Sequence, residues 1–314
     1  MENSNIKLYI GSGGNVYLPE CIENIIWETT RKSSPAKLEF TIITDGTMPL
    51  AEGNEVKLVC DEIDVFYGYV FSINRENNGR ISAVAYDQLR YFKNKDSYAY
   101  QSMTAGELLK MIASDYGLKT GEICNTEYKI PSRVECGLTL FDIIGNALDI
   151  TKSNIGRDFV MYDDCGKINL CEPEKLRVDI LIAEDCAESF ELRSTINSGV
   201  YNKIKISRTR ENCSVFDIAE DKEKISEWGI LQYFRGADKT AEAASLLNLY
   251  NTPNCSLFIK NACGNINVRG GSAVAVEVNF GETKIKKYVL VEHSKHELKN
   301  GLHLMSLDCK LKLL

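Results

Sequence analysis

The sequence predicts a β-rich α+β protein in which a small α+β domain is inserted between two β-rich regions. Apolar and polar side chains alternate over most of the first 95 residues, helical patterns appear between residues 96 and 187, and alternation returns from residue 188. We therefore expect domains at 1–95, 96–187 and 188–314, the last with a helical excursion at about 213–252.

The first region has the pattern of short antiparallel strands joined by hairpins. Turn residues at Asp45-Gly46 and at 77–79 separate alternating runs at 37–43, 55–60 and 80–86. In the longest run we expect one apolar, buried face made of Ile63, Val65, Tyr67, Tyr69, Phe71 and Ile73. Five or more such strands in under 100 residues usually close into a barrel or a sandwich.

The middle region changes to a helical period. A capping box of Thr104 and Glu107 opens the run TAGELLKMIASDYG, and Thr139 opens TLFDIIGNALDITKSN. A hairpin is expected at 158–172, with its turn at 164–166. These patterns predict a small α+β domain.

Alternation in the last region begins with a strand that carries Ile204 and Ile206 and continues into Arg208 and Arg210. We expect this strand to leave its own core and to reach solvent or a partner. A polar excursion and a helix at 238–251 follow, and then three strand patterns, SAVAVEVNF, KKYVLVEHS and LHLMSLDCKLKLL, within the last of which the chain is expected to end.

Composition excludes several classes of function. The chain has 44 acidic and 37 basic side chains, a net charge of −7, and no apolar window long enough to cross a membrane. Its N-terminus lacks a cationic start followed by an apolar core, so we expect neither membrane insertion nor Sec-dependent secretion. Because the basic residues are scattered, nucleic-acid-specific binding is not expected.

The 11 cysteines contain no CxxC pair, and several lie in strand patterns, such as Cys60 and Cys309. This usage predicts free, mostly buried thiols in a protein made in a reducing cytoplasm. No signature of a cysteine nucleophile surrounds any of them.

Motifs for catalysis or cofactor binding are absent or weak. The glycine run 11–15 is followed by Pro19 and a strand pattern, which favours a hairpin turn over a phosphate loop. The adjacent carboxylates Asp163 and Asp164 are expected to be solvated turn residues. The three histidines, His293, His296 and His303, lack the paired spacing of a zinc site. We therefore predict no catalytic, cofactor-binding or metal site.

Several runs resemble the baseplate hub proteins of contractile phage tails, in the branch found in defective prophages and phage-tail-like bacteriocins. The C-terminal run HSKHELKNGLHLMSL also looks like the ending of the related late control protein D family. The matching segments are SPAKLEFTI, VFYGYVFSINRE, AYDQLRYFKNKDSYAY, LFDIIGNALDIT, FVMYDDCGKINL and YNKIKISRTRE.

This resemblance implies a non-enzymatic homotrimer with two β-barrel, tube-type domains per subunit around the inserted α+β domain. Three copies of two barrels would give six approximate repeats, which suit a hexameric tail tube on one face and a central spike on the other. Baseplate wedge and tape measure proteins would be further partners, and assembly would precede release of the particle from the cytoplasm. The two β-rich regions, however, do not look alike in sequence.

Two other classes of function stay open. A tail-associated peptidoglycan hydrolase or protease would need an acidic pair, or Cys and His, converging in a cleft. A carbohydrate-binding receptor module would need exposed aromatic side chains on one face, whereas Tyr67, Tyr69 and Tyr86 lie in alternating strands and are expected to be core residues. The sequence does not identify interface residues.

Overall fold

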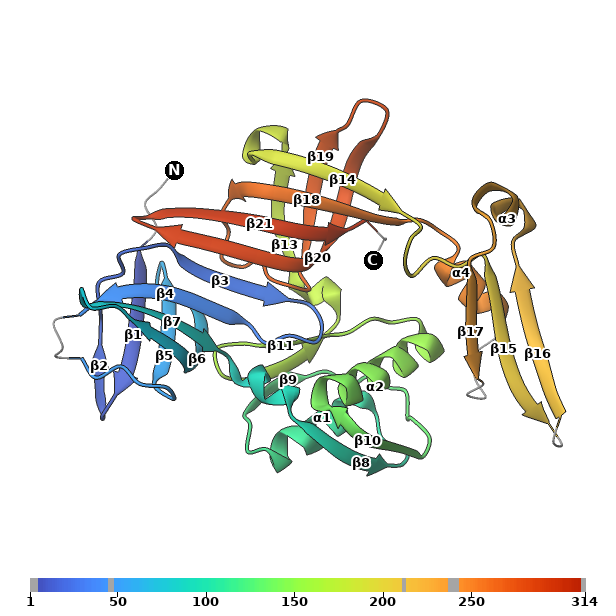
Figure 1. Ribbon diagram of the computed structural model, residues 1–314, viewed down its shortest axis with the longest axis horizontal. Coiled ribbons are helices and arrows are strands. Elements are labelled where there is room, and N and C mark those ends of the chain that lie inside the picture. The colour runs from blue at the N-terminus through green and yellow to red at the C-terminus, as the bar shows by residue number, and fades with distance from the viewer. Residues whose placement is uncertain (1–4, 45–47, 211–212, 237–242, 312–314) are drawn as a thin grey trace. The chain divides into compact units, whose positions relative to one another are not determined.

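The computed structural model describes residues 5–44, 48–210, 213–236 and 243–311 (Figure 1). These residues form two compact units. Unit 1 contains the described residues up to Glu191 and from Leu257 onward, and unit 2 runs from Leu192 to Ser256. No helix within the described ranges is both long enough and apolar enough to span a membrane.

The N-terminal part of unit 1 is an antiparallel sheet with the strand order β2-β1-β5-β6-β7-β4-β3. Its strands are β1 (Ile6–Ser12), β2 (Asn15–Tyr17), β3 (Ile25–Thr30), β4 (Lys37–Ile43), β5 (Glu55–Cys60), β6 (Ile63–Arg75) and β7 (Arg80–Tyr86). The predicted alternation is confirmed on β4, β5 and β7, whose buried side chains include Leu38, Phe40, Ile42, Val56, Leu58, Ile81, Ala83 and Ala85. The hairpin at 77–79 is confirmed by the β6–β7 pairing, whereas the expected Asp45-Gly46 turn lies outside the described residues.

The predicted core face of β6 is wrong. Phe66 and Val70, each 2% exposed, belong to the core, whereas Phe71 and its neighbours on the predicted face are only half-buried or exposed. The true core face also carries polar residues near the strand ends, so alternation over the whole strand favoured the opposite, more apolar face. Gly68 lies on the true core face, where a Cβ atom would come within 2.2 Å of the Tyr86 carbonyl oxygen. A bulge between Val70 and Ser72 then shifts the alternation.

The second β region of unit 1 continues the same sheet. Its strands are β13 (Arg177–Ala183), β19 (Ala273–Asn279), β20 (Lys284–Lys299) and β21 (Leu302–Lys310), together with the unit 1 residues of β14 (Ser189–Thr195) and β18 (Asn254–Cys263), which both cross a boundary between the units. The early part of β20 pairs with β19, and its later part pairs with β3 from His293 opposite Thr30 to Leu298 opposite Ile25. The alternation predicted for β21 is confirmed at Met305, Leu307 and Cys309, which are buried; Leu313 lies outside the described residues.

The two β regions therefore share one 13-stranded sheet through the β3–β20 pair. Two separate closed barrels were expected, and no closed ring of strands occurs among the described residues. A β-rich α+β fold is observed. Strand β20 makes the sheet continuous through both β regions, because a strand of 16 residues is long enough to pair with different strands along its length.

The α+β region of unit 1 forms a core of its own. Its elements are η1 (Gln88–Lys93), β8 (Lys95–Tyr100), α1 (Ala105–Asp115), β9 (Thr120–Ile123), β10 (Arg133–Thr139), α2 (Leu140–Ile155), β11 (Val160–Asp163), β12 (Ile168–Cys171) and η2 (Pro173–Leu176), and a further short turn, η3 (Glu184–Cys186), lies between β13 and β14. The Thr104 capping box at α1 and the Thr139 cap at α2 are confirmed. The predicted hairpin is the β11–β12 pair, with Cys165 and Gly166 in left-handed conformations at its turn.

Unit 2 is a small sheet with one helix packed against it. The strand order is β16-β15-β17, with β15 (Lys203–Arg210) central between β16 (Cys213–Glu220) and β17 (Gln232–Gly236). The helices are α3 (Lys222–Trp228), where only a polar excursion was expected, and α4 (Ala243–Tyr250).

The core of unit 2 contains Ile204 and Ile206, which pack with Ala243 of α4. The side chains of Arg208 and Arg210 lie outside the described residues, so the path expected for this strand stays a prediction. The domain boundaries expected at 95/96 and 187/188 also stay predictions.

Candidate functional site

The adjacent carboxylates of the β11–β12 hairpin do not share one environment. Asp164 is exposed as predicted, but Asp163 is only 5% exposed, so its assignment as a solvated turn residue is wrong. Its Oδ1 atom accepts a hydrogen bond from the Gly166 N–H at 2.7 Å, and its Oδ2 atom accepts one from Gln88 Nε2 at 2.7 Å. The hairpin turn and η1 thus supply the donors that make burial of this carboxylate tolerable.

A second buried carboxylate, Asp87, lies in the same cluster. It is 1% exposed, and it accepts hydrogen bonds from the N–H groups of Ala36 at 3.1 Å and Leu89 at 3.0 Å. Neighbouring Gln88 also exchanges hydrogen bonds with the backbone of Lys119, at 3.1 and 3.2 Å.

Arg269, from the loop between β18 and β19, completes the cluster. Its guanidinium donates to the Asp163 carbonyl oxygen at 2.7 Å and lies 4.5 Å from the centre of the Tyr162 ring. We call the set of Asp87, Gln88, Asp163 and Arg269 the acid junction. Burial raises the pKa of Asp87 well above its usual value, with a further rise from Asp163, and burial also raises the pKa of Asp163.

A second polar cluster, the ion junction, also connects the α+β region to the sheet. The Arg31 guanidinium contacts Glu292 of β20 at 2.9 Å and Asp158, which follows α2, at 3.3 Å. Lys152 of α2 lies 2.6 Å from the same Asp158 carboxylate. Burial acts to raise the pKa values of Asp158 and Glu292, but the neighbouring cations lower both overall.

The histidines form a buried pair and a separate third residue. His296 is fully buried, and its Nε2 atom lies 2.8 Å from the Val268 carbonyl oxygen. Because a carbonyl can only accept, Nε2 of His296 carries the proton and its Nδ1 accepts from His303 Nε2 at 2.9 Å. His293 instead lies 4.0 Å from Asp308.

Both members of the histidine pair are disfavoured as cations. Burial lowers the pKa of His296 to about 3 and that of His303 to about 4. No group of three or more His, Cys, Asp or Glu side chains that could hold a metal ion occurs within the described ranges. The arrangement is that of a neutral structural pair.

The glycine run is a hairpin turn, as predicted. Ser12 pairs with Asn15, and the residues between them, Gly13 and Gly14, have φ angles of 59° and 82°. Positive φ at both central positions is the geometry of a two-residue turn that glycine adopts at little cost. Strand β2 follows, so no helix N-terminus is present to hold a phosphate.

The aromatic side chains proposed as core residues are half-buried, so that assignment is wrong. Tyr67 and Tyr69 meet edge to face at 5.8 Å, and Tyr86 meets Phe71 in the same way at 5.6 Å. The Arg90 guanidinium of η1 lies 5.3 Å from the Phe71 ring centre. These side chains pack among themselves and against η1.

The ten cysteines whose side chains are described are free thiols. Cys60 and Cys309 are buried as expected, whereas Cys136 and Cys263 are exposed. The side chain of Cys213 lies outside the described residues.

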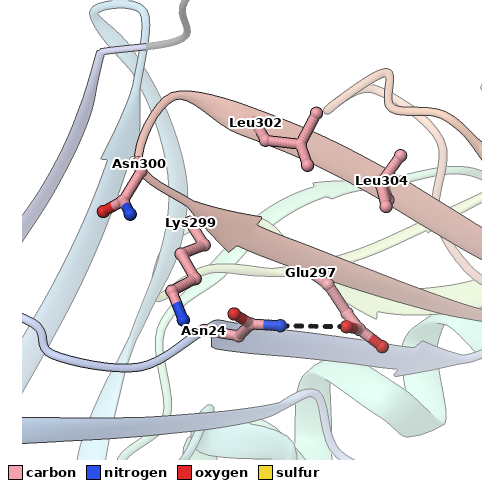
Figure 2. Close-up of a pocket in the computed structure, with 6 residues that line it drawn as sticks. All are labelled: Asn24, Glu297, Lys299, Asn300, Leu302 and Leu304. Atoms are coloured by element: carbon pink, nitrogen blue, oxygen red, sulfur yellow. Dashed lines mark hydrogen bonds between the residues drawn. The ribbon is translucent and has the colours of Figure 1, made fainter.

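A shallow pocket of about 250 Å³ lies beside the turn between β20 and β21 (Figure 2). Asn24 donates to Glu297 across its floor at 3.1 Å, and Lys295 contacts the other oxygen of Glu297 at 2.6 Å. Lys295 lowers the pKa of Glu297, so this carboxyl is not suited to act as a general acid. The lining residues are Asn24, Glu297, Lys299, Asn300, Leu302 and Leu304.

Sequence patterns missed an apolar surface on unit 2. The sheet face opposite α4 carries Phe216, Ile218 and Phe234, which are 45%, 50% and 58% exposed. Lys205 of the central strand lies between Ile218 and Phe234 in register, and its Nζ atom is 4.0 Å from the Phe216 ring centre. Exposed apolar clusters of this kind are typical of interaction surfaces. The sequence feature that could have revealed this surface is the presence of apolar residues on both faces of β16.

Comparison with known proteins places this geometry in context. The model of the YqbQ-like family matches residues 25–310. The phage-like element PBSX protein XkdQ of Bacillus subtilis strain 168 is 29% identical over an alignment of 300 positions that covers 91% of each chain.

Two solved structures have a similar fold. The prophage MuSo2 43 kDa tail protein of Shewanella oneidensis matches with a TM-score of 0.71 and 11% identity, over 96% of this chain and 98% of that one. The Escherichia coli c3393 protein, a type VI secretion component described as structurally similar to the T4 tail proteins gp27 and gp5, matches with a TM-score of 0.58 and 10% identity, over 97% of this chain and 76% of that one. The chain thus has the fold of a prophage tail protein and belongs to the YqbQ-like family.

Proposed function

We propose that this protein is a structural component of a phage-type contractile tail and acts there as the baseplate hub. The observation that carries the proposal is the likeness to a prophage tail protein over nearly the full length of both chains, together with a relative from a phage-like element that matches 91% of each chain. The role is that of a trimeric adaptor between a hexameric tail tube and a central spike.

The arrangement of unit 1 suits a part that carries load. One antiparallel ladder runs through both β regions by way of the β3–β20 pair, so a force on either region is resisted by hydrogen bonds that must break together. The acid junction and the ion junction hold the α+β region against this sheet. A rigid adaptor with no catalytic, cofactor or metal role is the function that we propose.

The proposed assembly is a homotrimer that also contacts the tape measure and baseplate wedge proteins. The apolar face of unit 2 is a surface that such assembly could cover. The free thiols fit assembly in the bacterial cytoplasm, before release of a phage or of a headless bacteriocin (tailocin). A tail-associated hydrolase and a carbohydrate-binding module are supported less well, because the pocket lacks a poised acid and the aromatic residues pack against one another.

Imaging of the assembled particle tests this proposal. We expect three copies of the chain between the tube and the spike, and loss of intact tails when the gene is deleted. Six copies or one copy at that position would contradict the trimeric hub. Tails of normal shape made without the protein would contradict a structural role of any kind.

A further inference from the structure

The acid junction joins three parts of unit 1 that are distant in sequence. Asp87 follows β7 and holds the Ala36 N–H before β4. Asp163 ends β11 in the α+β region, and Arg269 comes from the loop before β19. The strength of the contact between the α+β region and the two β regions therefore depends on the charges at this point.

The charges of the acid junction do not balance when both acids are ionised. Two buried carboxylates face one guanidinium, and Arg269 binds the main-chain oxygen of Asp163. Asp164 and Asp64 add negative charge around this turn, which also carries the Cys165 thiol. The uncharged Gln88 amide and the Gly166 N–H donate to the Asp163 carboxylate. Binding of a single proton would bring the cluster formed by Asp87, Asp163 and Arg269 to zero net charge.

We propose that Asp87 and Asp163 together hold one proton in the folded protein, and that this proton tightens the contact between the α+β region and the sheet. The junction is then a pH-sensitive device, firmer in mild acid than in alkali. It is independent of the proposed role in a tail.

The direction follows from linkage. Burial raises the pKa of both acids, so the folded chain binds a proton that the unfolded chain has already released. The stabilisation is fully present near the ordinary aspartate value of 3.8 and is lost as the pH rises through the raised values. Each unit by which a pKa is raised corresponds to a factor of about ten in the equilibrium.

Carbon-13 NMR of the side-chain carboxyls in the full chain gives the direct test. We expect at least one of Asp87 and Asp163 to titrate well above its ordinary value. Hydrogen exchange of the Ala36, Leu89 and Gly166 amides, which donate to these carboxylates, should show protection that falls about tenfold per pH unit over the same range, after correction for the intrinsic rate.

Two variants distinguish the effect of the bound proton from a general effect of substitution on folding. In Asp163→Asn the pH dependence of this protection should disappear, whereas the adjacent exposed Asp164→Asn should keep it. If Asp163→Asn does not fold, Arg269→Gln provides the second test, because loss of the cation should move the transition to higher pH. Titration of both acids at ordinary values, or equal pH dependence in the wild type and Asp163→Asn, would overturn the proposal.

Discussion

The acid junction and the ion junction hold the same α+β region, but they respond to protons in opposite directions. In the ion junction each carboxylate has a cation within 3.3 Å, and the pKa values of Asp158 and Glu292 are lowered. In the acid junction the two carboxylates are more deeply buried, the Arg269 guanidinium donates to the main-chain oxygen of Asp163, and the pKa values of Asp87 and Asp163 are raised. Acid therefore weakens the first contact and strengthens the second.

The comparison teaches that burial alone does not fix the behaviour of a polar contact. Burial acts to raise the pKa of every carboxyl in the two clusters, more strongly in the acid junction, where the carboxylates are the more deeply buried. In the ion junction, direct contacts with cations outweigh burial and give the net shift the opposite sign.

Strand β6 also contacts η1, the element that contains Gln88 of the acid junction, through aromatic side chains. These rings carry no charge, so their contact serves as a reference for the two charged junctions. Phe71 packs against Tyr86 of β7 and Tyr91 of η1, while Phe66 on the other face of β6 is fully in the core. We expect Phe66→Ala to lower the free energy of unfolding by about 3 to 5 kcal/mol and the half-buried Phe71→Ala by about 1 to 2 kcal/mol. Denaturant unfolding measures both, and equal losses would contradict the assignment of faces.

The ion junction should depend strongly on Arg31. Arg31→Met keeps most of the side-chain volume but leaves Glu292 and Asp158 with only Lys310 and Lys152. We expect a loss of about 2 to 3 kcal/mol in unfolding free energy, because partly buried Glu292 loses a bidentate partner and Asp158 loses one of its two cations.

The neighbouring residue provides a matched control for Arg31. Lys32 also forms an ion pair with α2, at 3.3 Å from Asp149, but both side chains are exposed. Lys32→Ala should cost about 0.5 kcal/mol or less. If it cost as much as Arg31→Met, burial would not be the property that gives the ion junction its strength.

Much of the strand pattern could be predicted from the sequence, but the junctions could not. Alternation placed β4, β5 and β7 correctly, and the capping residues Thr104 and Thr139 located both helices. Local patterns describe pairs a few residues apart, whereas Asp163 is buried by Gln88, which lies 75 positions away. The β3–β20 pair has an even larger separation.

The buried His296 also makes the stability of the fold depend on pH. Its contribution must be measured before the pH dependence of the two junctions is compared. The pKa of His296 is lowered from 6.5 to about 3 by burial, so the unfolded chain binds a proton that the folded chain refuses. The stability that depends on neutral His296 is complete above 6.5 and is lost as the pH falls toward the folded value. Between about pH 6.5 and pH 5 this amounts to about 2 kcal/mol. His303, whose pKa is lowered to about 4, acts in the same direction, so His296→Phe should reduce the fall in urea midpoint over that range without abolishing it. An unchanged slope would refute this assignment.

The smallest effect is expected at the edge of the acid junction. Asp164 follows Asp163 but is exposed, and its own N–H and carbonyl groups are paired with Lys167 across the turn. Because its side chain is solvated, Asp164→Asn should change the unfolding free energy by about 0.5 kcal/mol or less and leave particle yield unaltered. Asp163→Asn should cost more than Asp164→Asn, because an amide has one acceptor oxygen for the two donors, the Gly166 N–H and Gln88 Nε2, that the carboxylate of Asp163 accepts from. Thermal unfolding of the two variants at matched pH measures the difference. Equal stability of the two variants would contradict the assignment of Asp163, and not Asp164, to the acid junction. The contrast between the acid junction and the ion junction would then lose its structural basis.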